Sequence, residues 1–199
     1  MEQEAALAAA NVRELTRNMV AGIAPYDTLE AAHQKETLAW IDSNLPLHRT
    51  AKPDTPPMHL VSYFAVLDRG RQALLLVDHR KAHAWLPPGG HVELHEDPRL
   101  TVAREAQEEL ELHATFDAVA GDQPLFITVT KTRGPGTHTD VSLWFVLEGN
   151  ASRPLAFDTG EFHAVQWLSF DDVLAMEQSR QDPHLHRFVG KLQQRLAES

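Results

Sequence analysis

The sequence predicts an α+β fold in which a mixed sheet surrounds one central helix and a pair of helices precedes the sheet. Three observations support this prediction. Apolar residues recur at helical spacing near the start, a proline-rich segment follows, and strand-like runs then flank one amphipathic helix. The chain has 199 residues, of which 43% are hydrophobic, which is enough for one domain with a real core and an appendage.

The N-terminal helices are expected at residues 3–24 and from Asp27 to about Asn44. Asp27 has a side chain suited to the N-cap of the second helix, and Glu30 would complete a capping box. Their apolar stripe could form a homodimer, cover a substrate cleft or fill out the core, and the sequence does not choose among these.

The proline-rich stretch marks a boundary, because it contains four prolines and no periodicity. We expect three parts: a helical extension at residues 1–45, a linker at 46–57 and the main domain at 58–199.

Period-two runs and helix-start signals define the remaining elements. Strands are expected at 60–67, 73–77, 125–131, 141–147 and 165–168, with an extended Pro-Pro-Gly-Gly corner within 85–94. Helices are expected from Pro98 to Leu110 behind the cap Asp97, over 171–178, and over 183–196 behind the cap Asp182.

Composition excludes several classes of function. The formal net charge of −10 disfavours bulk binding to nucleic acid or to an anionic membrane. Without cysteine, the chain has no disulfide framework, thiolate zinc site or cysteine nucleophile. No stretch approaches the roughly 20 apolar residues of a membrane span, and the first residues do not read as a signal peptide. We therefore expect a soluble cytoplasmic protein.

Three carboxylates on the central helix carry the strongest chemical signal. Glu105, Glu108 and Glu109 stand at positions i, i+3 and i+4, which places them on one face. Like charges at this spacing cost the helix a few tenths of a kcal/mol per pair, so a cation or full solvation must offset them. Mg²⁺ prefers such oxygen ligands. A solvated acidic face is the alternative for these three residues alone.

Two packing expectations accompany this helix. Arg104 is expected to pair with Glu96, which precedes the helix. An apolar stripe is expected to face the core, and it comprises Leu100, Ala103 and Leu110, with Ala106 beside them.

The wider spacing resembles a known family. The pattern Gly90-x5-Glu96-x7-Arg104-Glu105-Ala106-x-Glu108-Glu109-x-Glu111-Leu112 resembles the Nudix box, and the flanking strands resemble the rest of the Nudix fold. This resemblance implies an α/β/α sandwich and an enzyme that uses Mg²⁺ or Mn²⁺ to hydrolyse a phosphoanhydride bond. Glu111 departs from the pattern, because the family has a glycine there as a left-handed helix cap. A glutamate there would either strain the backbone by about 1 kcal/mol or alter the exit from the helix into the loop.

The resemblance also implies residue roles. Glu105 would act as ligand or general base, Arg104 would orient the carboxylates, and Glu108 would contribute to both catalysis and metal binding. The implied metal ligands are the Gly90 carbonyl, Glu105, Glu108, Glu109 and, from the loop before the last strand, Glu161, with Asp158 as the substitute. A plain solvated loop is the alternative for these last two residues.

Substrate contacts are expected outside this motif. His138 and Asp140 open a strand and could touch the substrate, and Trp85 and Trp144 could stack on a base. Lys131-Thr132-Arg133 could meet phosphates, although a solvated hairpin tip is the alternative. The chain has twelve histidines, but no His-Glu-x-x-His or similar cluster, so zinc is not predicted.

Two functions remain. The first is a hydrolase acting on a small nucleotide, either a nucleoside triphosphate or a nucleoside diphosphate linked to another moiety. The second is a Nudix-like sensor that binds a nucleotide without turnover. The intact Arg104, Glu105, Glu108 and Glu109 favour catalysis.

Overall fold

A seven-stranded mixed sheet forms the centre of the computed structural model, which describes residues 2–52, 55–132 and 136–198. The strands are β1 (Met58–Asp68), β2 (Ala73–His79), β3 (Ala84–Leu86), β4 (Gly89–His91), β5 (Phe126–Lys131), β6 (Thr139–Glu148) and β7 (Phe162–Ser169). The helices are α1 (Glu2–Gly22), α2 (Thr28–Asp42), α3 (Pro98–Leu110), α4 (Phe170–Ala175) and α5 (Leu185–Ala197), with a 3₁₀ turn at Gln178–Arg180.

The strand order is β3-β2-β1-β6-β5, while β4 pairs with β1 and β7 pairs with β2. The long β1 and β6 run parallel over ten residue pairs, and the other pairings are antiparallel. β1 is buried on both faces, as its nearly continuous apolar sequence requires. These findings confirm the predicted α+β class and the mixed sheet.

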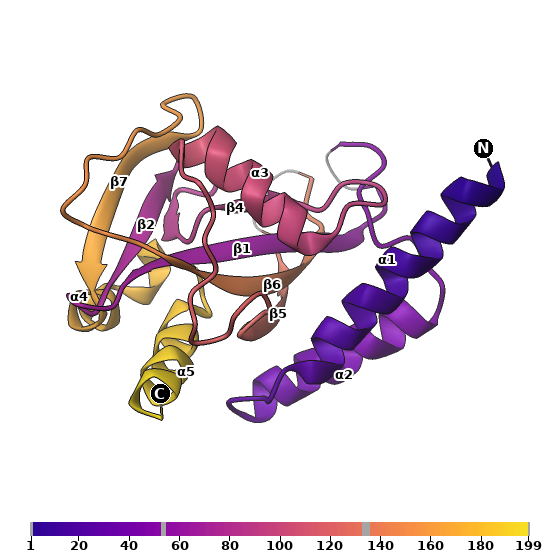
Figure 1. Cartoon of the computed structure of the whole chain (residues 1–199), viewed down its shortest axis with the longest axis horizontal. Helices are drawn as coiled ribbons and strands as arrows, with labels where there is room; N and C mark the ends of the chain where they lie inside the picture. The colour runs from indigo at the N-terminus through magenta and orange to yellow at the C-terminus, as the bar shows by residue number, and fades with distance from the viewer. Residues whose placement is uncertain (1, 53–54, 133–135, 199) are drawn as a thin grey trace.

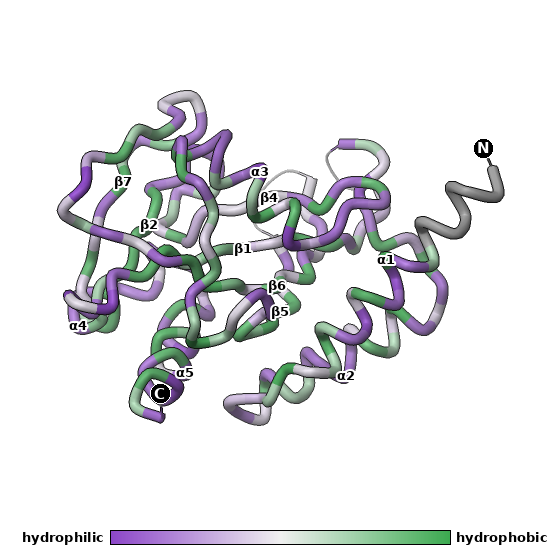
Figure 2. Tube along the Cα trace, in the orientation of Figure 1, coloured by the Kyte–Doolittle hydropathy of each residue, from purple (hydrophilic) through white to green (hydrophobic). Residues whose placement is uncertain are grey.

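Helices cover the sheet on two sides (Figure 1). One core cluster contains Phe64 of β1 together with Val102, Ala106 and Leu110 of α3. Phe188 of α5 belongs to the cluster on the opposite face. Figure 2 shows hydrophobic segments along the central strands between these layers. Among the described residues, no helix combines the length and apolar character needed to cross a membrane.

The N-terminal helices pack against the same core as α3. Their buried apolar residues belong to that core cluster, and they are Met19, Val20, Ile23, Trp40 and Ile41. Figure 1 shows α1 and α2 side by side at one end of the sheet. The apolar face of these helices is therefore buried within one chain. A homodimer through these helices stays a prediction.

The start of α2 is capped as predicted, but Glu30 has a different role. Asp27 accepts a hydrogen bond from the Glu30 N–H at 2.8 Å. The fully buried Glu30 carboxylate accepts from the Tyr26 N–H at 2.6 Å and from the Ile127 N–H at 3.2 Å, and it pairs with Lys191 at 2.7 Å. Glu30 therefore joins α2 to strand β5 and to α5, instead of closing a capping box on Asp27.

Two local expectations were wrong. On α3, Leu100 is 62% exposed and Ala103 is exposed, because the buried face turns toward Val102, Ala106 and Glu109. The last helix begins at Leu185 with His184 at its N-cap position, so Asp182 lies two residues before the cap. Asp182 instead accepts from the His184 N–H at 2.8 Å.

Candidate functional site

Two glycines let strand β4 lie directly against the carboxylates of α3. A Cβ at Gly90 would overlap the carboxylate of Glu105, and a Cβ at Gly89 would overlap the Ser62 carbonyl. Gly89 also has a φ of 148°, a conformation that only glycine adopts freely. The close approach leaves the backbone of β4 and the helix carboxylates lining one space.

Arg104 organises the entrance to this space. Its Nε and Nη2 donate to the two oxygens of Glu96, each at 3.1 Å, which is the predicted pair in a bidentate form. Its Nη1 donates to Glu105 Oε1 at 2.7 Å, and Nη2 donates to the His91 carbonyl at 3.2 Å. The guanidinium therefore fixes the position of Glu105 relative to the backbone of β4.

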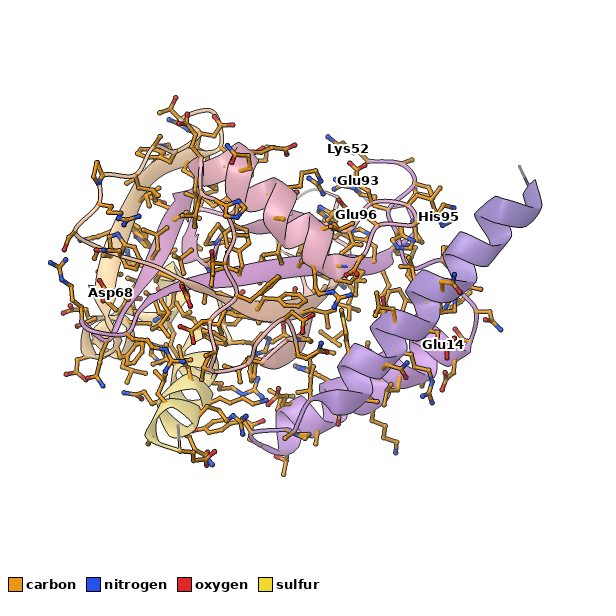
Figure 3. The ribbon with its side chains drawn as sticks, viewed as in Figure 1. Glu14, Lys52, Asp68, Glu93, His95 and Glu96 are labelled. Carbon is orange, nitrogen blue, oxygen red and sulfur yellow. The ribbon has the colours of Figure 1, made fainter. Side chains whose placement is uncertain are left out.

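Glu96 holds the loop between β4 and α3. Its Oε2 accepts from the Glu93 N–H at 3.0 Å and from the Thr101 hydroxyl at 2.7 Å. Figure 3 shows Glu93, His95 and Glu96 together in this loop. These contacts fit the structural role expected for Glu96.

Glu109 is the most unusual acid of the group. Its side chain projects into the interior, the residue is 5% exposed, and Oε2 accepts from the Gly89 N–H at 3.1 Å. Burial, followed by the charges of Glu105 and Glu161, raises the pKa of Glu109 to about 9. Burial also raises the pKa of Glu105, against the opposing effect of Arg104. Several carboxylates thus share a poorly solvated space.

Glu161 and Glu108 lie at the margins of the space. The half-buried Glu161 is close enough to raise the pKa of both Glu105 and Glu109. Its loop is anchored to α3, because the Asp158 N–H donates to the Glu109 carbonyl at 2.8 Å. The Glu108 side chain is 61% exposed and lies 3.5 Å from Arg104.

The donor set fits a hard divalent cation. Carboxylate and backbone carbonyl oxygens are the ligands that Mg²⁺ and Mn²⁺ prefer. Glu109 is buried beside Glu105 and Glu161, and this burial raises its pKa and makes its ionised form costly. A divalent cation would supply the missing charge.

The predicted substrate contacts are dispersed. Trp144 is fully buried, donates from Nε1 to Thr128 at 3.0 Å and packs on Phe188, so we withdraw it as a base-stacking residue. Trp85 is half-buried on β3. In the predicted phosphate-binding run, Lys131 is exposed, whereas Arg133 lies outside the described residues.

His138 and Asp140 lie in a cluster that the sequence did not predict. They face His59 and His91, and one ligand atom from each of the four residues lies within 4.8 Å of the others. These four residues share no short sequence motif, because they lie on separate parts of the chain. His138-x-Asp140 was a usable signal, but the other two residues join it only through the pairing of β4, β1 and β6.

Comparisons with known proteins identify the family of this chain. The family model described as NUDIX domain matches residues 58–188. A "MutT-like protein" from Streptomyces ambofaciens is 31% identical over 119 residues, which cover 60% of this chain and 70% of that relative.

Solved structures share the fold. An Ap4A hydrolase binary complex from C. elegans matches with a TM-score of 0.55 and 17% identity, over 70% of this chain and 98% of the other. The NUDIX domain of NrtR from Shewanella oneidensis, complexed with ADP ribose, matches with a TM-score of 0.53 and 17% identity, over 69% and 87%. At this identity, the likeness shows the fold alone.

Proposed function

Because this chain belongs to the Nudix hydrolase family, we propose that it hydrolyses a phosphoanhydride bond in a small nucleotide and requires Mg²⁺ or Mn²⁺. The proposed substrate is a nucleoside triphosphate or a nucleoside diphosphate linked to another moiety. The Ap4A and ADP ribose named for the two structural neighbours are both nucleotides with such bonds, which supports this class without selecting one member.

One observation carries the proposal: Glu105 and the buried Glu109 flank the Gly89-Gly90 backbone, with Glu161 nearby. A solvated acidic face would leave these side chains in water. Here the helix instead turns Glu109 into the interior, where ionisation is costly without a cation. We assign the Gly90 carbonyl, Glu105, Glu109 and Glu161 as ligands.

The ions, when bound, would neutralise phosphate charge and lower the pKa of a bound water. Within the chain, Arg104 holds Glu105 by a 2.7 Å hydrogen bond, so Glu105 is positioned either to bind or to accept a proton from that water. The exposed Glu108 would act at the solvent side, through direct or water-mediated contact. Trp85 remains our candidate for contact with a base.

Substrate screening tests the proposal. We would incubate the full chain with a panel of nucleoside triphosphates and nucleoside-diphosphate conjugates, with Mg²⁺, Mn²⁺ or chelator, and follow the products by ³¹P NMR. We expect metal-dependent cleavage of at least one compound and a loss of a hundredfold or more in Glu105→Gln and Glu109→Gln. Glu14→Gln is the matched control, because Glu14 is exposed on α1, away from α3 (Figure 3).

The same panel separates the enzyme from the sensor. Undiminished turnover in both glutamine variants would refute the assigned residues. Saturable thermal stabilisation by a nucleotide, with no product from any compound, would instead identify a binding module whose metal site serves recognition.

A further inference from the structure

Four metal-ligating side chains gather on the sheet face opposite α3. His59 of β1 is the direct register partner of Asp140 of β6, and His91 of β4 pairs with Val61, two residues along β1. Residues two apart on a strand share a face, so these three side chains and His138 point to the same side. Gly90 pairs with Ser62 and therefore faces the other side, toward α3.

The ligand atoms converge. His59 Nε2 lies 2.9 Å from His91 Nε2 and 3.4 Å from Asp140 Oδ1, and His138 Nε2 lies 3.2 Å from the same oxygen. His91 Nε2 is 3.8 Å from it. In a tetrahedral zinc site with bonds of 2.0–2.1 Å, neighbouring ligand atoms are about 3.3 Å apart. Four of the six pairs in the cluster lie 2.9–3.8 Å apart, and all six lie within 4.8 Å.

Hydrogen bonds to backbone carbonyls orient the rings of His59 and His138. His59 Nδ1 lies 2.9 Å from the Pro56 carbonyl, and His138 Nδ1 lies 2.9 Å from the Gly136 carbonyl. Because a carbonyl only accepts, each Nδ1 must carry a proton, and each Nε2 then faces the centre of the cluster. This is the tautomer and support expected of a metal-bound histidine.

Asp140 has a buried carboxylate oxygen that faces these rings. Its Oδ1 atom is buried and accepts no hydrogen bond from the described residues, although three imidazole nitrogens lie within 4 Å. A carboxylate oxygen facing imidazole lone pairs is unfavourable unless extra protons or a metal ion separate them.

We propose that His59, His91, His138 and Asp140 bind a divalent transition-metal ion, zinc by the nature of the ligands, at a site separate from the α3 carboxylates. Three imidazoles and one carboxylate favour zinc over Mg²⁺. Four protein ligands are typical of a closed structural site. The ion would clamp β4, β1 and the start of β6, and so hold the strand that carries Gly90. Arg49, whose Nη1 lies 3.3 Å from His91 Nε2, must move aside.

Metal-binding measurements on the full chain test this inference. We would strip the protein with chelator, dialyse it against Zn²⁺ or Mg²⁺, and measure bound metal by elemental analysis and the melting temperature. We expect one zinc per chain, a higher melting temperature with zinc, and the absorption bands of tetrahedral Co²⁺ after substitution. His138→Gln and Asp140→Asn should each weaken zinc binding at least tenfold.

Two controls locate the ion. His163→Gln changes an exposed histidine on β7 and should retain zinc. The double variant Glu105→Gln/Glu109→Gln should also retain zinc while losing hydrolysis, which separates this inference from the proposed function. Loss of zinc in that double variant, equal binding in His138→Gln, or a wild-type chain that takes up neither zinc nor cobalt would each overturn the inference. The cobalt spectrum of the wild-type chain tests the proposed metal site even if a variant fails to fold.

Discussion

The Glu105 carboxylate lies against the Cα of Gly90, in the space that any side chain at position 90 would occupy. Gly90→Ala should therefore displace Glu105 without straining the backbone, since Gly90 does not have a positive φ. We expect hydrolysis to fall at least tenfold while the melting temperature changes by only a few degrees. Gly22→Ala is the control, because a Cβ there meets nothing within 4 Å. Equal activity in both variants would contradict the assigned role of Glu105.

Arg104→Lys should uncouple the loop from the helix. A lysine ammonium cannot replace the bidentate contact with Glu96 while also holding Glu105. We expect the free energy of unfolding to fall by about 1–2 kcal/mol and kcat to fall more than KM rises. Arg17→Lys makes the same exchange in an exposed pair with Asp42 and should change neither quantity measurably. Urea denaturation and steady-state kinetics provide the comparison.

Glu111→Gly should stabilise the protein. Glu111 ends α3 with φ 49° and ψ 31°, which is the strained left-handed conformation and not an altered exit from the helix. Relief of this strain is worth about 1 kcal/mol. Glu111→Ala keeps the Cβ and should give no such gain, so the two variants separate backbone strain from loss of charge. A denaturation midpoint that rises equally in both would assign the effect to charge instead.

Acid should weaken the contact between α2 and α5. The hydrogen bond from Arg187 to Asp27, more than any other contact, lowers the pKa of that carboxyl to about 2. A lowered pKa means that the stabilisation is complete above the unfolded value near 4 and is lost as pH falls toward 2. Asp27→Asn should therefore cost about 1–2 kcal/mol at pH 6 and progressively less below pH 4. A difference that stays constant from pH 6 to pH 3 would argue against this pair.

Features that depend on short stretches of the chain could be predicted from the sequence. Two features, the start of α3 at Asp97-Pro98 and the Arg104–Glu96 pair, each depend on neighbours within a few residues or on one motif. The apolar runs of β1 and β6 likewise predicted strands. Such features follow from short-range rules, which a single chain displays directly.

Features that depend on contacts between distant parts of the chain could not be predicted from the sequence. His59 and His138 meet only because β1 and β6 align in parallel, and no spacing in the chain encodes that register. The buried face of α3 was assigned to Leu100 because leucine normally packs inside. The helix instead turns Glu109 inward. A pattern of apolar residues does not predict a buried carboxylate.

Through the buried Glu30, the first two helices cover part of the edge of strand β5. Strand β5 is the outer member of the sheet beside β6, and its Ile127 N–H is occupied by Glu30 rather than by water. Cutting away α1 and α2 would uncover a ready template for intermolecular β-augmentation. A shortened chain should therefore self-associate or precipitate, and recombinant work on the catalytic portion alone would need a charged gatekeeper on β5 to stay dispersed.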